Sequence, residues 1–138
     1  MNAKETAKPE NMFLMFNHSL SKDQETDAQN IWGTQLQFVG LPGQLKALWA
    51  QIPADKQELF DTLAPFRRWL EKQSRPNDLV LIQGDFGATW LMVQYALNTN
   101  LVPVYSVTVR LASEERSPDG MVKNTHFFKH QMFRLYGI

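Results

Sequence analysis

The stretch Leu79-Val80-Leu81-Ile82-Gln83-Gly84-Asp85-Phe86-Gly87-Ala88-Thr89 decides the expected fold. Residues 79–82 form a continuous apolar run, which is typical of a strand buried on both faces. Two glycines follow, and residues 88–97 then place Leu91, Met92 and Tyr95 at the spacing of one helix face. A buried strand that runs straight into a helix is typical of an α/β domain.

The rest of the chain repeats this alternation of strand and helix. The expected strands are 12–16, 35–39, 79–82 and 101–109. The expected helices are 22–31, 44–51, 54–73 and 88–97, with a polar loop over 113–120 and a final strand or hairpin over 122–128 and 131–136. Ser21 and Gln24 have the spacing of a capping box at the start of the first helix. Pro65 indicates a kink or two abutting helices within 54–73. The pattern predicts a single Rossmann-like domain over residues 12–138, with a mostly parallel sheet, right-handed crossovers and helices on both faces. We expect residues 1–11 to be a disordered tail.

Composition limits the functions that the chain can have. The 138 residues suit one domain, and 14 basic against 14 acidic side chains give a net charge of zero, which argues against a protein that coats long nucleic acid. There is no cysteine, which excludes disulfides, thiolate catalysis and cysteine-based zinc sites. The apolar run over 12–16 is shorter than a signal-peptide core, and no segment approaches the ~20 apolar residues of a membrane helix. We therefore expect a cytoplasmic protein without membrane contact.

Candidate site residues are the polar residues that follow the buried strands, because ligands of open parallel sheets bind beyond the carboxyl ends of the strands. Three segments qualify: Asn17-His18-Ser19, Gln83 to Thr89, and Ser106 to Arg110.

The glycine segment matches neither the dinucleotide fingerprint nor the Walker loop. Its glycines allow a close backbone approach, and the free N–H groups of the following helix could hold an anion. A plain strand-to-helix turn explains the same residues. Asp85 could act as a base or simply cap the helix, and Thr89 could bind a ligand or only its own backbone.

The histidines also admit two interpretations. His18 follows the first strand and suits proton transfer or phosphate contact, although capping or packing would equally account for it. His126 and His130 have the spacing of two ligands on one helical face but lack a nearby acidic third ligand, so we expect neither a metal site nor a cofactor.

The chain from Arg110 onward carries five basic and three acidic side chains, interleaved with four aromatic ones. Base stacking beside phosphate contacts has this composition. An ordinary edge strand with a solvated outer face has it as well.

Several of these segments together resemble a known family, the small standalone ring nucleases of type III CRISPR systems, whose core is similar to the CRISPR-associated Rossmann (CARF) fold. The matching segments are Met12–Leu20, Leu81–Thr89, Leu101–Tyr105 with Thr108 and Arg110, Phe128–His130, and Phe133-Arg134. The resemblance implies that the chain binds cyclic oligoadenylate, most of all the tetra-adenylate ring, and linearises it, which switches off antiviral signalling. It also implies a homodimer with the ring lying across the two-fold axis.

Ring opening of this kind uses the substrate's own ribose 2′-OH as the nucleophile, so the protein mainly orients the ring and stabilises charge on the phosphoryl oxygens. We assign the phosphate to the segment Gly84, Asp85, Phe86, Gly87, Ala88 and Thr89. Arg110 and Lys129 would supply positive charge, and Asn17 and Gln83 would contact ribose or base, with Ser19 and Thr108 as further ligand contacts. His18 is the leading candidate for proton transfer and His130 is the alternative acid or base.

Two other functions fit the same residues. A sponge would bind the ring without turnover, and only product analysis separates it from a slow nuclease. An unrelated flavodoxin-like or nucleotide-sensing domain would share only the glycine turn, and a bound flavin would colour the purified protein.

Overall fold

The sheet is mostly parallel and carries one antiparallel edge strand. The computed structural model describes residues 8–138, apart from the side chains of residues 125 and 126. The strands are β1 (Asn11–Met15), β2 (Gln37–Gly40), β3 (Leu79–Ile82), β4 (Val102–Arg116) and β5 (Val122–Leu135), and the helices are α1 (Lys22–Trp32), α2 (Gly43–Ala50), α3 (Ala64–Gln73) and α4 (Phe86–Asn98). The strand order is β2-β1-β3-β4-β5, with β1 to β4 parallel and β5 antiparallel to β4.

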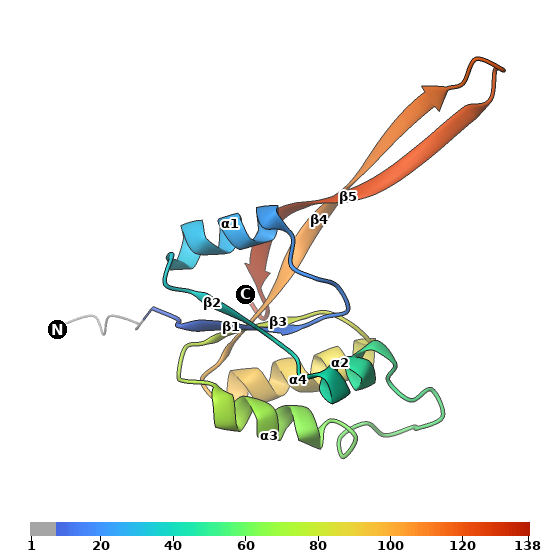
Figure 1. Ribbon diagram of the computed structural model, residues 1–138. Helices are drawn as coiled ribbons and strands as arrows, with labels where there is room; N and C mark the ends of the chain where they lie inside the picture. Colours follow the sequence, from blue (N-terminus) through green and yellow to red (C-terminus); the bar gives the residue numbers. More distant parts are fainter. Residues whose placement is uncertain (1–7) are drawn as a thin grey trace.

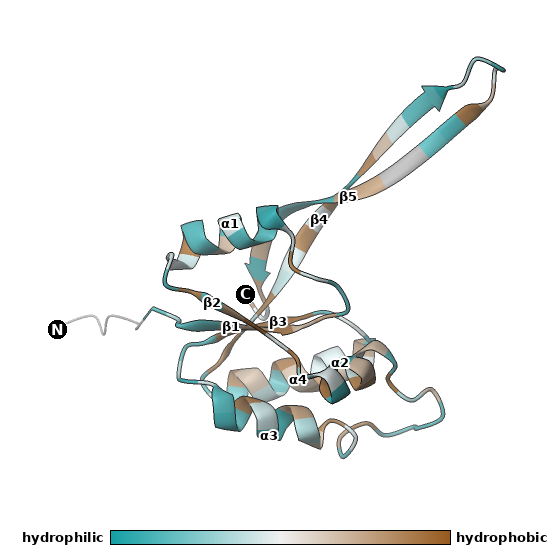
Figure 2. Ribbon diagram, viewed as in Figure 1, coloured by the Kyte–Doolittle hydropathy of each residue, from teal (hydrophilic) through white to brown (hydrophobic). Residues whose placement is uncertain are grey.

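Helices cover both faces of the sheet, as expected of a Rossmann-like domain (Figure 1). Helix α1 lies on one face, and α2, α3 and α4 lie on the other. Because side chains alternate along a strand, β3 supplies both layers: Val80 and Ile82 join the core under α3 and α4, and Leu79 and Leu81 join the core under α1. The hydropathy colouring shows the same inner concentration of apolar residues (Figure 2). The fully buried run Leu79–Ile82 is confirmed as a central strand.

The carboxylate of Asp78 fastens the start of the sheet. Asp78 is fully buried, and it accepts hydrogen bonds from the backbone N–H groups of Glu10, Asn11 and Arg75 and from the Asn11 amide, at 3.0–3.1 Å. The bonds join the amino end of β1 to the turn before β3. Strand β1 therefore begins one residue before its predicted start, and the prediction of a disordered tail does not hold at Glu10 and Asn11; residues 1–7 lie outside the described residues.

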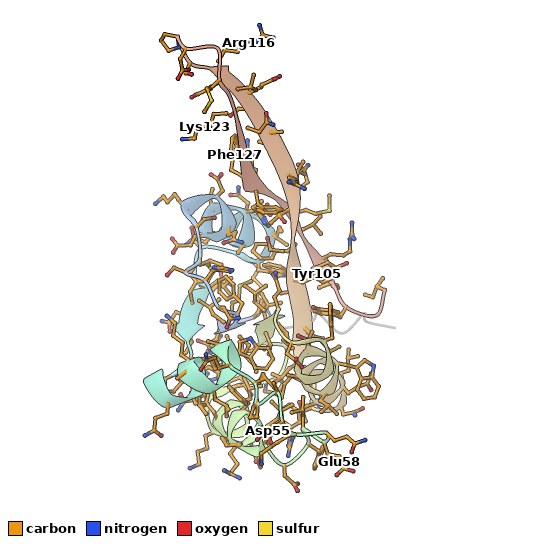
Figure 3. The ribbon with its side chains drawn as sticks, turned by 90° about the vertical axis from the view of Figure 1, so that its right-hand side faces the viewer. Asp55, Glu58, Tyr105, Arg116, Lys123 and Phe127 are labelled. Atoms are coloured by element: carbon orange, nitrogen blue, oxygen red, sulfur yellow. The ribbon has the colours of Figure 1, made fainter. Side chains whose placement is uncertain are left out.

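The β4–β5 hairpin extends well beyond the body of the domain (Figures 1 and 3). The two strands pair from Val104 and Leu135 to Arg116 and Val122, with one irregularity between Val107 and Thr108. The predicted polar loop over 113–120 is therefore wrong in its first half, since strand pairing continues to Arg116. Residues 122–135 form one continuous strand, which confirms the final strand of the two predicted alternatives, a strand or a hairpin.

Two predicted helices differ in extent from the observed ones. The pattern over 54–73 is helical only from Ala64, because Pro65 is tolerated in the first turn of a helix and not in its interior. Helix α4 begins at Phe86 and not at Ala88, because the side chain of Asp85 caps it by accepting a hydrogen bond from the Ala88 N–H.

Candidate functional site

A cavity of about 560 Å³, lined mainly by residues with polar side chains, opens at the carboxyl ends of β1 and β3 and beside the middle of β4, on the α1 side of the sheet. Ligands of open α/β sheets bind in the crevice at this same place, beyond the carboxyl ends of the strands. Its lining residues come from the β1–α1 loop, α1, the end of β3 and the hairpin: Phe16, His18, Ser19, Ser21, Gln24, Gln83, Ser106, Thr108, Phe128 and His130.

A chain of hydrogen bonds runs through the wall of this cavity. The Nε2 atom of His130 lies 2.7 Å from an oxygen of Asp27, and its Nδ1 atom lies 2.6 Å from the Ser106 hydroxyl. Only 5% of the His130 side chain is exposed, and its ring packs 4.5 Å from the ring of Phe133. The imidazole is therefore fixed in orientation, with both nitrogens engaged.

Gln24 and Gln83 hold Ser106 from two directions. The Gln24 amide donates to the Ser106 hydroxyl at 3.1 Å, and the Gln83 side-chain oxygen accepts from the Ser106 backbone N–H at 2.8 Å. Gln24 also closes the predicted capping box with Ser21, because its side-chain oxygen accepts from the Ser21 N–H. Gln24, which completes the cap of α1, thus also organises the cavity.

The turn after β3 is held at two successive carbonyl groups. The Tyr136 hydroxyl donates to the Ile82 carbonyl at 2.7 Å, and the Trp49 indole donates to the Gln83 carbonyl at 3.0 Å. Burial raises the pKa of the Tyr136 hydroxyl above its ordinary value, so the hydroxyl remains a donor further into the alkaline range. Gln83 is thereby placed firmly enough to position Ser106.

His18 and Ser19 lie between this cavity and an adjoining hollow of about 310 Å³. The hollow extends to Lys46 on α2 and to Glu25 on α1. Lys46 lines the same hollow as His18, and nothing in its sequence context indicated this position.

The glycine segment does not line the cavity beyond Gln83. Asp85 caps α4 and occupies the Ala88 N–H, while the Thr89 N–H bonds to the Asp85 carbonyl. Ala88 is buried in the core and Phe86 is 95% exposed, and the Thr89 hydroxyl has no hydrogen-bond partner among the described residues. The Asp85 carboxylate therefore occupies the position at the start of α4 where a bound phosphate was predicted.

The two glycines of this segment have different surroundings. Neither has a positive φ angle. A Cβ atom on Gly84 would lie 2.8 Å from the indole nitrogen of Trp49, whereas one on Gly87 would meet nothing closer than 3.5 Å. Gly84 is therefore required by the close approach of Trp49.

The predicted hairpin residues divide between the two faces of the hairpin. Thr108 and His130 are cross-strand partners in the cavity, and Arg110 pairs with Phe128 at the next position on the same face. Arg110 is exposed there, just beyond the cavity lining. Lys129 instead borders a separate hollow beside α1, and Asn17 is exposed without lining the cavity.

Three residues of the hydrogen-bond chain were absent from the predicted site: Gln24, Asp27 and Ser106. Gln24 and Asp27 lie three residues apart and so share a helix face, a signal visible in the sequence. Ser106 was within a strand-end segment already considered. Their pairing with His130, 103 residues after Asp27, depends on the hairpin register, which the sequence did not fix.

Comparison with known protein families identifies relatives of this chain. Residues 10–134 match the family model described as "Uncharacterized protein MJ1673 family". The chain belongs to this MJ1673 family. The protein "Uncharacterized protein MJ1673" of Methanocaldococcus jannaschii is 45% identical over 125 residues, which cover 91% of this chain and 95% of that protein. No solved structure matches the chain.

The MJ1673 family match contains every residue of the cavity and of its hydrogen-bond chain. Within residues 8–138, no helix is long and apolar enough to cross a membrane. In the same described part of the chain, no three histidine, aspartate or glutamate side chains gather as a metal ion would require.

Proposed function

We propose that this protein is a cytoplasmic ring nuclease that binds cyclic oligoadenylate, with the tetra-adenylate ring as its substrate, and opens the ring by attack of a ribose 2′-OH. The observation that carries the proposal is the cavity at the strand ends with the Asp27–His130–Ser106 hydrogen-bond chain in its wall. The resemblance of the strand-end segments to ring nucleases supplies the substrate class.

The proposed cleavage depends mainly on how the protein orients the substrate, because the nucleophile is the substrate's own 2′-hydroxyl. The 2′-oxygen of one ribose attacks the adjacent phosphorus, the bond from phosphorus to the 5′-oxygen breaks, and the products end in a 2′,3′-cyclic phosphate and a 5′-hydroxyl. The protein must hold the attacking oxygen in line and donate to the phosphoryl oxygens. Arg110, which follows Thr108 on the cavity face of the hairpin, and Lys46, which lines the adjoining hollow together with His18, would supply the positive charge.

A second copy of this chain is the proposed partner. The hairpin face opposite His130 exposes Val109, Leu111, Phe127 and Met132, and an isolated two-stranded ribbon is only marginally stable in water. Phe86 and Trp90 of α4, 95% and 62% exposed, lie at the end of the sheet from which the hairpin leaves. The cross-strand pair Glu115–Lys123 puts both charges on that face, so two-fold pairing can match opposite charges.

The experiment is incubation of the purified protein with rings of three to six adenylates in excess EDTA, followed by chromatography and mass spectrometry. We expect cleavage of the tetra-adenylate ring to linear fragments with 2′,3′-cyclic phosphate ends. Products with a 5′-phosphate, or activity that requires added magnesium or manganese, would refute the mechanism. Tight binding without any product would identify a sponge instead.

Arg110→Ala tests the phosphate contact. It should weaken ring binding and reduce the salt dependence of the affinity by about one phosphate contact. Lys72→Ala, which removes an exposed charge from α3, is the matched control and should leave both quantities unchanged. Equal effects of the two substitutions would assign Arg110 to a solvated surface.

A further inference from the structure

We propose that Asp27, His130 and Ser106 form a proton relay in which the Ser106 hydroxyl oxygen is the acceptor for the attacking 2′-OH. The relay rests on the proposed function for the identity of the substrate hydroxyl. Ser106 is assigned as the catalytic residue that touches substrate, His130 receives the proton, and Asp27 is the positioning residue.

The surrounding partners determine which atoms of Gln24 and His130 donate hydrogen bonds and which accept them. The Gln24 side-chain oxygen is occupied by the Ser21 N–H, so its amide nitrogen is the atom facing Ser106. A carboxylate only accepts, so the neutral His130 ring carries its proton on Nε2, toward Asp27. Nδ1 is then an acceptor.

The Ser106 hydroxyl has one hydrogen and two acceptor lone pairs. One lone pair receives the Gln24 amide at 3.1 Å, and the hydrogen points to Nδ1 of His130 at 2.6 Å. One lone pair therefore remains. Because Ser106 lines the cavity, this lone pair suits a hydrogen bond from a hydroxyl group of the ligand.

Each proton and bond in the proposed step is accounted for. The 2′-OH proton passes to the Ser106 oxygen while the Ser106 proton passes to Nδ1 of His130. The bond from the 2′-oxygen to phosphorus forms, the bond from phosphorus to the 5′-oxygen breaks, and the departing 5′-oxygen takes a proton from water. The resulting imidazolium lies between the Asp27 carboxylate and the Ser106 oxygen, where both neighbours stabilise its charge. His130 returns the proton to solvent after the product leaves.

The first test reads the relay without any substrate. Nitrogen-15 NMR of the intact protein, with the His130 signals assigned by their loss in His130→Gln, reports which ring nitrogen carries the proton. We expect the single Nε2–H tautomer in the wild type when the ring is neutral, and a mixture in Asp27→Asn, whose amide can either accept or donate. The Nδ1–H tautomer in the wild type would overturn the relay.

The second test compares binding of cyclic tetra-adenylate with that of its 2′-deoxy counterpart. One hydrogen bond from the 2′-OH should make the ribose ring bind about three- to tenfold more tightly to the wild type. Ser106→Ala should abolish this preference, whereas Ser113→Ala, a serine of the same strand outside the cavity, should retain it. Retention of the preference in Ser106→Ala would overturn the assignment of Ser106.

Measurement of kcat and KM distinguishes a role of Asp27 and His130 in proton transfer from a role in packing alone. Asp27→Asn and His130→Gln should lower kcat about 100-fold, the usual contribution of a general base, with KM changed less than threefold. Both variants could instead unfold or lose affinity for the ring while their folded fraction keeps a normal kcat. That result would show that the chain of bonds has only a structural role.

Failure of the relay and failure of the proposed function give different results. If the wild type leaves every ring intact while the tautomer and the 2′-OH preference are as expected, the chain of bonds remains as a binding contact for the 2′-OH, and both cleavage and proton transfer are refuted. If the wild type cleaves the ring but shows the other tautomer, cleavage stands and the relay is refuted.

Discussion

Removal of the buried Asp78 carboxylate should cost a large part of the domain's stability. Asp78→Ala leaves three backbone N–H groups and the Asn11 amide without their acceptor. A net contribution of about 1 kcal/mol for each of the four bonds gives a loss of about 4 kcal/mol. Against the total of about 5–15 kcal/mol that small domains have, this loss would be severe.

Asp78→Asn provides an internal scale for the same site. The asparagine oxygen can accept two of the four bonds, while its NH₂ group faces the donors of the other two, so we expect a loss of about 2 kcal/mol. Asp55→Asn, an exposed aspartate at the opposite end of the view in Figure 3 from the hairpin tip, is the control and should stay within about 0.5 kcal/mol of the wild type. Urea unfolding at neutral pH, followed by tryptophan fluorescence, measures all three variants. If Asp78→Ala lies within about 1 kcal/mol of the Asp55→Asn control, the carboxylate does not fasten the start of the sheet and the reasoning fails.

Three further predictions concern the turn after β3 and the hairpin. Gly84→Ala should destabilise the domain by about 1–3 kcal/mol, because its Cβ would lie 2.8 Å from the rigid indole of Trp49. Gly87→Ala should be neutral, since its Cβ would meet nothing closer than 3.5 Å. Equal urea midpoints for the two variants would contradict this prediction. Burial raises the folded-state pKa of Tyr136 above its unfolded value of about 10, so its contribution to stability is present below about pH 10 and is lost as pH rises through the folded pKa. Urea midpoints at about pH 8 and about pH 11 should therefore fall less in Tyr136→Phe than in the wild type, and an identical fall would contradict the linkage. Phe127→Ser should shift sedimentation at micromolar concentration from dimer to monomer without changing the far-UV circular dichroism; a wild-type monomer, free and with ring bound, would refute the proposed partner.

The sequence predicted the parallel core well because its signals are local. The short apolar run Leu79–Ile82, with a turn before it and glycine after it, indicated a buried strand, and the capping box of Ser21 and Gln24 marked the start of α1. Each signal depends on residues within a few positions of one another. The strand-end rule then placed His18, Gln83 and Thr108 in one region, and the structure brings all three into one cavity.

The hairpin was predicted poorly because its polar strands carry no burial pattern. Residues Ser113 to Arg116 are charged and polar, and their strand form depends on pairing with Val122 to Thr125 across the turn. Such pairing is set by turn geometry and cross-strand contacts, and neither is visible as a local hydrophobic period. The length of the hairpin therefore emerged only from the structure.

The glycine segment shows how a correct local inference about structure does not by itself supply the donors that an anion needs. Gly84 and Asp85 do form a strand-to-helix turn with a capped helix, and yet the cap occupies the N–H that an anion would need. The polar groups that remain accessible lie on the other side of the strand ends, where α1 faces the hairpin.

Because Asp27 and Ser106 come from segments 79 residues apart and meet only through His130 of the antiparallel edge strand, the hairpin register decides whether the relay exists. A one-residue slip of β5 against β4 would turn His130 to the opposite face, leaving Asp27 and Ser106 without the imidazole between them. The irregularity between Val107 and Thr108, which resets the pairing immediately before Thr108 and His130, is therefore as much a part of the candidate site as the three side chains.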